Sequence, residues 1–166
     1  MSKNQLLMEQ IVCVYHPEFV KSQDLRNFGQ SHAEIFNIER LIEESLAAVG
    51  GYAFVDAAGY DFLPDYSDSK TVSVVNNGKN KVIIISNVEN KIGALRVTIY
   101  NPFNDMIDYM FIPPDAVAYL QENDGTKGTA NANKKRIRTS WTNYTNYYNK
   151  LERFRVRSFV ELATAV

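Results

Sequence analysis

Apolar residues follow a helical spacing first and a strand-like spacing later in the chain. They recur with a helical period between residues 32 and 49, and Gly50-Gly51 ends the run. This spacing predicts an amphipathic helix over about residues 32–49. Ser31-His32-Ala33-Glu34 has the S-x-x-E order of a capping box, in which two polar side chains satisfy free amides at a helix start. We therefore expect the helix to begin there.

After the glycines, short runs are rich in Val, Ile and other residues that favour extended backbone. Turn residues separate these runs, most clearly at Asn76-Asn77-Gly78-Lys79-Asn80. The expected strands are Tyr52–Asp56, Ser69–Val75, Lys81–Val88, Ala94–Tyr100, Ile107–Ile112 and Lys134–Trp141.

Other segments give weaker signals. A short helix is expected from Pro114 to about Glu122, and another at the second capping box, Ser158-Phe159-Val160-Glu161. Asn123–Asn133 is polar and of low complexity, so we expect a loop there. The stretch up to about Arg26 predicts either a short helix or a strand. This order predicts an α+β fold, or an α/β fold, with a mixed central sheet flanked by helices, in one domain spanning residues 1–166.

Composition narrows the protein class. The chain has 166 residues, 45% apolar and 22% charged, which is the balance of an ordinary globular domain. Its single cysteine, Cys13, excludes an internal disulfide and paired-cysteine zinc or redox sites, and two histidines are too few for a His-rich metal site. The sequence has neither a membrane-spanning apolar run nor a signal peptide, so we expect a cytoplasmic protein that does not bind membranes.

Acidic residues and a lysine gather around the first expected strands. Glu39 and Glu43 are four residues apart and share one face of the expected helix. Asp61 precedes Asp68 by seven positions, and Lys70 follows at a spacing that places Asp68 and Lys70 on the same side of a strand. Converging carboxylates bind Mg²⁺ through oxygen, and a neighbouring lysine can orient a water molecule. These residues predict a metal-dependent hydrolytic site.

The arrangement resembles the PD-(D/E)xK nuclease superfamily, whose metal-dependent members include many type II restriction endonucleases. In that family an acidic residue precedes a (D/E)-x-K tripeptide on an adjacent strand, and a helix often supplies one further Glu. The D-x6-(D/E)-x-K spacing of Asp61, Asp68 and Lys70 is similar to the compact version found in the mismatch-repair nicking endonuclease and its restriction-enzyme relatives. The resemblance covers about Glu39 to Tyr100. It implies a restriction-endonuclease-like core in which Asp61 and Asp68 bind Mg²⁺, Lys70 positions the attacking water and Glu43 is the helix carboxylate.

Two other interpretations of these residues stay open. Asp65 followed by Glu89-Asn90-Lys91 also spells the family motif, although Glu89 and Lys91 lie where an expected strand gives way to a loop. Lys91 or Arg96 could then reach a scissile phosphate. Alternatively, the carboxylates form a solvated face, with the helix acids paired to Arg40 or water and the residues from Asp65 onward serving as turn formers.

Positive charge is concentrated near the C-terminal end. Gly125–Arg157 holds nine basic residues and one acidic residue, although the whole chain has a net charge of −1. Aromatic residues are interleaved with these cations, which neutralise phosphates while aromatic rings stack on bases. We expect a DNA-binding segment at about residues 125–157, unless these residues form a solvated surface over a core of aromatic rings. The candidate contacts are Lys134, Lys135, Arg136, Arg138, Arg153 and Arg155.

An acidic metal site with a separate cationic segment predicts an Mg²⁺-dependent DNA endonuclease, sequence-specific like type II restriction enzymes. Its substrate would be double-stranded DNA. We expect a homodimer, because so small a chain needs two-fold symmetry to cut both strands of a palindrome. Two other classes remain: a non-catalytic nucleic-acid-binding regulator of phage or plasmid origin, and a protein-interaction module that uses the acidic half. Metal-dependent cleavage separates the first class from the others, and salt-sensitive DNA binding separates the second from the third.

Overall fold

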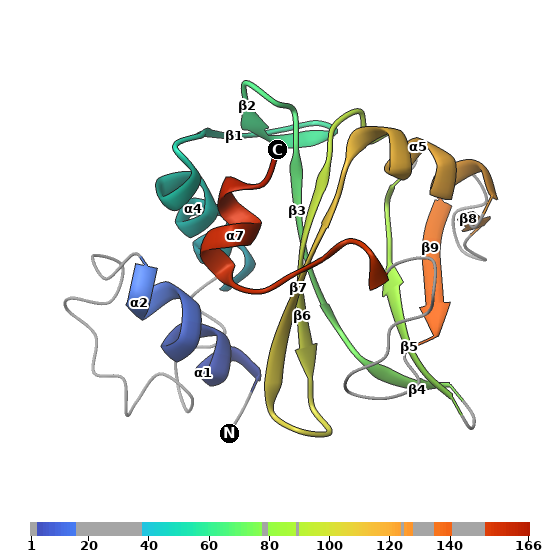
Figure 1. Cartoon of the computed structure of the whole chain (residues 1–166), viewed down its shortest axis with the longest axis horizontal. Coiled ribbons are helices and arrows are strands. Elements are labelled where there is room, and N and C mark those ends of the chain that lie inside the picture. The colour runs from blue at the N-terminus through green and yellow to red at the C-terminus, as the bar shows by residue number, and fades with distance from the viewer. Residues whose placement is uncertain are drawn as a thin grey trace.

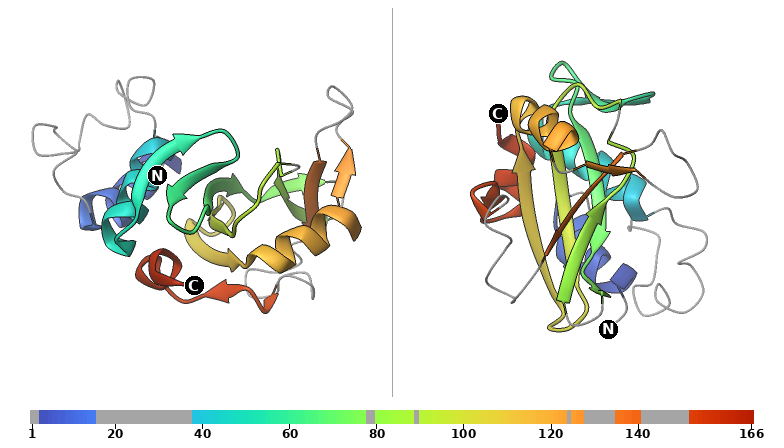
Figure 2. Two further views of the ribbon diagram at one scale, coloured as in Figure 1. Left: turned by 90° about the horizontal axis from the view of Figure 1, so that it is seen from above. Right: turned by 90° about the vertical axis from the view of Figure 1, so that its right-hand side faces the viewer.

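The chain has a mixed α+β fold in three layers (Figure 1). This computed structural model describes residues 3–15, 38–77, 80–88, 90–123, 125–127, 135–140 and 152–166. A mixed sheet forms the middle layer, helices cover one of its faces, and a second sheet with one helix covers the other (Figures 1 and 2). Among the described residues, no helix has the length and apolar character needed to span a membrane.

The central sheet has four strands in the order β10-β7-β6-β3. β3 runs parallel to β6, whereas the β6–β7 and β7–β10 pairs are antiparallel. All seven residues of β6 are buried, as expected for a strand covered on both faces. The strands are β3 (Asp68–Ser73), β6 (Leu95–Asn101), β7 (Met106–Ile112) and β10 (Arg155–Val156).

The second sheet is antiparallel throughout, in the order β4-β5-β9-β8. Ile83 and Ile85 of β5 pack with Leu95 and Val97 of β6, and Val117 of helix α5 joins this apolar cluster. The elements are β4 (Val75–Asn77), β5 (Asn80–Ile85), α5 (Pro114–Asn123), β8 (Gly125–Lys127) and β9 (Lys135–Ser140).

The helical layer packs on the opposite face of the central sheet. Alternate residues of β7 divide between the two cores, since Met110 and Ile112 face the second sheet while Tyr109 and Phe111 pack against the helices. The helices are α1 (Lys3–Leu7), a π-helical turn η1 (Met8–Val12), α2 (Cys13–Tyr15), α4 (Ile38–Gly50) and α7 (Phe159–Thr164).

A two-stranded hairpin, β1 (Ala53–Ala57) and β2 (Tyr60–Leu63), connects α4 to the central sheet. Gly59, with φ +90°, takes the left-handed conformation that the tight turn between the two strands requires. Phe62 is fully buried and contacts the rings of Tyr52 and Phe54, which anchors the hairpin beside α4. The hairpin therefore delivers the chain to the start of β3 along a fixed path.

The expected mixed sheet with flanking helices is confirmed, and most expected elements occur within a few residues of their predicted bounds. The cap at Ser158 is also confirmed, because its hydroxyl accepts a hydrogen bond from the Glu161 amide, although the Glu161 carboxylate accepts from the Arg157 amide instead of that of Ser158. The N-terminal stretch, where helix and strand both stayed possible, is helical over Lys3–Tyr15. The capping box expected at residue 31 lies outside the described residues, and the described part of the helix begins at Ile38.

Three expectations were wrong in detail, and two strands were missed. The strand expected over Ser69–Val75 is split at Val74, because the chain leaves the central sheet there and continues in the second sheet as β4. Asn76, Asn77 and Asn80 belong to paired strands instead of a turn. Gly125–Lys127, expected in a loop, forms β8 against β9. The short strands β2 and β10 were not expected, since each is stabilised by a partner rather than by its own pattern.

Candidate active site

A pocket of about 600 Å³ opens beside β3, the edge strand of the central sheet. α4, the β1–β2 hairpin and the segment after β5 form its other walls. All four side chains expected to be catalytic line it, although they come from three separate elements. Its charged lining consists of five acidic residues and two lysines: Glu39, Glu43, Asp56, Asp61, Asp68, Lys70 and Lys91.

Asp61 and Asp68 are the most deeply buried acids of the pocket, with 6% and 4% of their surface exposed. Backbone hydrogen bonds bring them together: the Asp61 amide donates to the Ser67 carbonyl, 3.0 Å away, and the Asp68 amide donates to the Ala94 carbonyl on the way into β6. The Ser69 amide in turn donates to Asp61 Oδ2 over 2.9 Å. β2 and β3 thus hold the two carboxylates side by side.

Two lysines approach the same oxygen of Asp68. Lys91 Nζ is 3.1 Å and Lys70 Nζ is 3.7 Å from Asp68 Oδ2. Lys70 lies two residues after Asp68 on β3, and the two side chains lie on one side of the strand as predicted. Burial lowers the pKa of Lys70, and the charge of Asp68 opposes that effect. Both lysines can therefore place positive charge at a ligand bound beside Asp68.

Asp61 also belongs to a second group of acids. Carboxylate oxygens of Glu43, Asp56 and Asp61 all lie within 4.8 Å of one another. Glu43 is on the face of α4 that it shares with Glu39, as the helical spacing predicted. Asp56 was not singled out in the sequence. It has φ 46° at a point where the β1–β2 register shifts, and such bulges redirect side chains.

The pocket disfavours negative charge on its own acids. Burial raises the pKa of Glu43 to about 8, and the neighbouring charges of Asp61, Asp56, Asp68 and Glu39 add to the effect. Burial and the charge of Asp68 raise the pKa of Asp61 to about 7, against the hydrogen bond from the Ser69 amide. A cation bound among these carboxylates would remove the mutual repulsion.

The donor set fits a hard divalent cation. Mg²⁺ prefers carboxylate oxygens and binds through one or two of them together with water and substrate phosphate. Asp61 is common to the pair with Asp68 and to the group with Glu43 and Asp56. Asp61 is therefore the central candidate ligand, because it is the acid that the two groups share.

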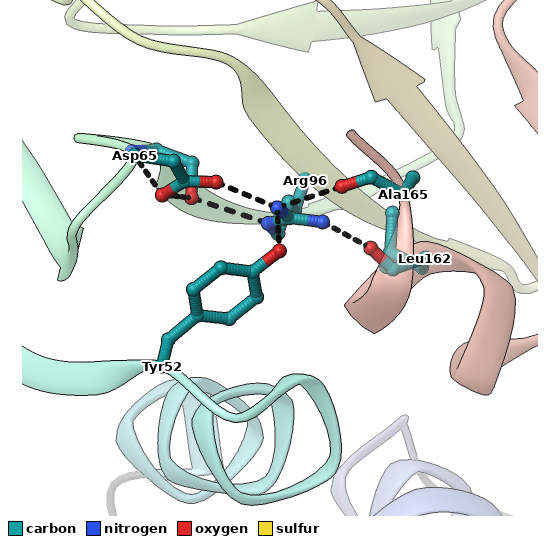
Figure 3. Close-up of polar contacts among 6 residues, drawn as sticks. Tyr52, Asp65, Arg96, Leu162 and Ala165 are labelled. Atoms are coloured by element: carbon teal, nitrogen blue, oxygen red, sulfur yellow. Dashed lines mark hydrogen bonds and ion pairs between the residues drawn. The ribbon is translucent and has the colours of Figure 1, made fainter.

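The alternative motif divides between two places. Asp65 accepts a hydrogen bond from Arg96 Nη2 over 2.8 Å and does not line the pocket (Figure 3). Arg96 is fully buried, so the expectation that it reaches a phosphate was wrong. Lys91 lies in the pocket with Asp68, and Glu89 lies outside the described residues. For Asp65 the turn-former interpretation is right, since its carboxylate accepts a hydrogen bond from the Ser67 amide.

The basic residues expected to bind DNA also lie in different places. Lys135, Arg136 and Arg138 belong to β9, whose backbone pairs Arg138 with the pocket-lining Ile84. Lys134 lies outside the described residues.

Arg153 and Arg155 lie at the opposite edge of the central sheet from β3, beside or within β10. Arg153 stacks on the Phe154 ring, and Arg155 Nη2 is 2.8 Å from Asp108 Oδ1. The basic segment therefore contributes one strand next to the pocket and two arginines far from it along the sheet.

No protein-family model and no curated protein matches the chain.

Proposed function

We propose that the protein is an Mg²⁺-dependent DNA endonuclease with a restriction-endonuclease-like core. The observation that carries the proposal is the convergence of Glu43, Asp61, Asp68 and Lys70 in one pocket. The motif spacing required these residues to meet, and a solvated acidic face would not bury Asp61 and Asp68 almost completely. Buried, mutually repelling carboxylates beside lysines are typical of sites that bind a cation and a charged substrate.

Each side chain of the pocket then has a role in hydrolysis of a phosphodiester bond. Asp61 and Asp68 would hold the metal, and Glu43 and Asp56 would complete the acidic group around Asp61. When bound, Mg²⁺ neutralises phosphate charge and makes water more acidic. Lys70 orients the attacking water, and Lys91 stabilises negative charge that develops on the phosphate. Water forms a new bond to phosphorus and loses a proton to solvent, while the bond to the leaving-group oxygen breaks and that oxygen takes up a proton from solvent.

The position of β9 supports DNA as the substrate. β9 is the neighbour of β5, and Ile84 and Ser86 of that part of the chain line the pocket. Lys135, Arg136 and Arg138 therefore belong to a strand close to the proposed cleavage site. Arg153 and Arg155 are less well placed, because β10 lies at the far edge of the central sheet. We expect the β9 cations to contribute more to DNA affinity than the β10 pair.

Cleavage of both strands of a duplex would require two pockets related by symmetry. We propose a homodimer that recognises a palindromic sequence. Nicks in one strand instead of double-strand breaks would argue for a monomer that works on one strand at a time.

The direct test is to incubate the purified protein with long unmodified phage DNA, in MgCl₂ or in EDTA, and to separate the products on a gel. Discrete bands in MgCl₂ alone would establish a sequence-specific endonuclease. A smear in MgCl₂ alone would mean a non-specific nuclease. Intact DNA in both lanes, with salt-sensitive binding, would overturn the proposal in favour of a binding protein.

Two pocket variants sharpen this test. Asp68→Asn and Lys70→Met should lower the cleavage rate roughly 100-fold or more, because each removes a group that acts directly on the reacting atoms. Both should still bind DNA in EDTA. Asp115→Asn is the matched control, since Asp115 is exposed in the first turn of α5 and does not line the pocket. Cleavage retained by both pocket variants would overturn the assigned roles.

A further inference from the structure

Arg96 is a fully buried cation on the helical side of the central sheet, and the proposed reaction does not use it. A buried guanidinium is tolerated only where its donors are paired. Arg96 Nε donates to Ser67 Oγ over 3.1 Å, and Nη2 donates to Asp65 Oδ2 over 2.8 Å and to the Tyr52 hydroxyl over 2.7 Å.

The remaining hydrogen bonds of Arg96 go to backbone carbonyls of α7 and of the residue after it (Figure 3). Nη1 donates to Leu162 and Nη2 donates to Ala165. The ring centroids of Tyr52 and Phe111 lie 4.7 and 4.9 Å from the guanidinium carbon of Arg96. We call Arg96, Asp65, Ser67, Tyr52 and the two carbonyls the Arg96 cluster.

The Arg96 cluster holds the turn between the two central carboxylates. Asp65 Oδ1 accepts hydrogen bonds from the Ser67 amide and from the Ser67 hydroxyl, at 3.0 and 2.7 Å. The Ser67 carbonyl accepts from the amides of Asp61 and Phe62. Ser67 is therefore connected to Arg96 through its side chain and to Asp61 through its carbonyl, and Asp68 is the next residue.

Arg96 also belongs to the strand that fixes Asp68. Ser69 of β3 is the register partner of Arg96 in β6, and the Asp68 amide donates to the Ala94 carbonyl two residues before Arg96. The Ser69 amide completes the arrangement by donating to Asp61 Oδ2. Both carboxylates thus take their positions from a frame whose buried centre is Arg96.

We propose that Arg96 is a positioning residue of the active site: through Asp65 and Ser67 it sets the distance and orientation of Asp61 relative to Asp68. Arg96 does not contact the metal or the substrate in this role. The expected effect on cation binding rests on the proposed function. The positioning of the two carboxylates rests on the hydrogen bonds alone. The hydrogen bonds from Arg96 to the carbonyls of Leu162 and Ala165 connect the Arg96 cluster to α7 and the residue after it.

The test uses Arg96→Lys, Asp65→Asn and Ser67→Ala. Arg96→Lys keeps the charge and loses the planar array of donors, while Asp65→Asn and Ser67→Ala remove single connections. Asp108→Asn is the matched control, because Asp108 pairs with Arg155 over the same 2.8 Å in the same sheet but far from the pocket. Circular dichroism establishes that each variant is folded at the assay temperature.

Two readouts follow. Isothermal titration with Mn²⁺ should show affinity lowered roughly tenfold or more in the cluster variants, as is usual when partners of metal ligands are removed, and unchanged affinity in Asp108→Asn. Amide hydrogen exchange measured by NMR should show protection lost at Asp61 and Ser69 in the cluster variants and kept in the control. The smaller changes, Asp65→Asn and Ser67→Ala, carry the test if Arg96→Lys does not fold.

The outcomes separate the two proposals. Wild-type protection at Asp61 and Ser69 in folded cluster variants would overturn the positioning role, whatever the protein does with metal. If the wild-type protein binds no Mn²⁺ and cuts no DNA, the proposed function fails. Loss of hydrogen-exchange protection at Asp61 and Ser69 in the variants would still support the positioning role of Arg96.

Discussion

Asp61 in β2 and Asp65 in the connection from β2 to β3 are four residues apart, but they lie in opposite surroundings. Burial would raise the pKa of Asp65, yet hydrogen bonds from the Ser67 hydroxyl and amide and from Arg96 outweigh it and hold the pKa below its usual value. Asp61 faces other carboxylates, and burial with the charge of Asp68 raises its pKa to about 7. The fold therefore supplies hydrogen-bond donors that stabilise the charge of Asp65, whereas Asp61 faces like charges.

This difference separates a structural carboxylate from one that is a candidate cation ligand. Donors that come from the protein itself make a carboxylate part of the framework, and nothing remains for it to bind. A carboxylate held next to like charges stores an unfavourable interaction that a bound cation relieves. Ser67 connects the two regions, because its hydroxyl donates to Asp65 and its carbonyl accepts from the Asp61 amide. The hydrogen bonds around Asp65 therefore help to hold Asp61 in place.

Replacing Arg96 with Met should have the largest effect on stability. The change removes the partner of Asp65 and the donor to two carbonyls of the C-terminal helix region. We expect the free energy of unfolding to fall by roughly 3–5 kcal/mol, the usual loss when one partner of a buried ion pair is removed. Urea unfolding followed by circular dichroism measures it. A loss below about 1 kcal/mol, typical of a surface pair, would contradict the structural role.

Gly93→Ala should come next. A Cβ on Gly93 would overlap the Tyr66 carbonyl and lie 2.9 Å from the Asp65 carbonyl oxygen, so the turn has to move. The expected loss is roughly 2–3 kcal/mol, in the range for overpacking at a rigid contact. Gly51→Ala is a useful comparison, since nothing lies within 4 Å of its Cβ position and only its φ of +76° opposes the change. Equal losses in the two variants would mean that the close contact at Gly93 is unimportant.

The framework could be predicted from sequence much better than its connections. β6 and β7 carry long apolar patterns that specify strands by themselves. β2 is only four residues long and pairs with β1 across a tight turn. β10 is two residues long and pairs with β7, which is distant in sequence. The split between β3 and β4 also depends on which sheet each half joins, which no local pattern records.

The site shows the same division. The spacing of Asp61, Asp68 and Lys70 could be read along the chain because β2 leads into β3 over a short connection. Asp56 could not, since a register shift in β1 brings it into the pocket. The burial of Arg96 could not be read from the sequence either, because its partners lie far from it along the chain. Its partner Leu162 lies 66 residues further on.

The pH dependence of stability should distinguish the two regions. Glu43 and Asp61 have pKa values of about 8 and about 7 in the folded protein, above the ordinary values of 4.5 and 3.8. The folded state therefore binds more protons than the unfolded state between the ordinary and the raised pKa values, and stability falls as pH rises from about 4 to about 8.

In EDTA we expect a loss of roughly 2 kcal/mol between pH 6 and 8, reduced by solvent screening at the half-buried Glu43. Mg²⁺ should abolish the loss, as measured by urea unfolding at each pH. The contribution of Asp65 has the opposite sign, since its pKa is lowered and its stabilisation disappears only as the pH falls into the acid range. Stability that is flat from pH 6 to 8 in EDTA would mean that the pocket acids are already neutralised by the two lysines.

The smallest change in the free energy of unfolding should come from removing the charge of Asp61 itself. Asp61→Asn keeps an oxygen that can accept from the Ser69 amide but removes the charge that Asp68 repels. At pH 8 in EDTA the variant should be more stable than the wild-type protein by about 1 kcal/mol, as is common when a functional site loses its strained group. Asp65→Asn should be less stable under the same conditions, because Arg96 loses its counter-charge. Added Mg²⁺ should stabilise Asp65→Asn to some extent and leave Asp61→Asn unchanged. If both variants lose stability and both respond to Mg²⁺ alike, then Asp61 is held as firmly by the fold as Asp65 is, and it is not the central ligand of the pocket.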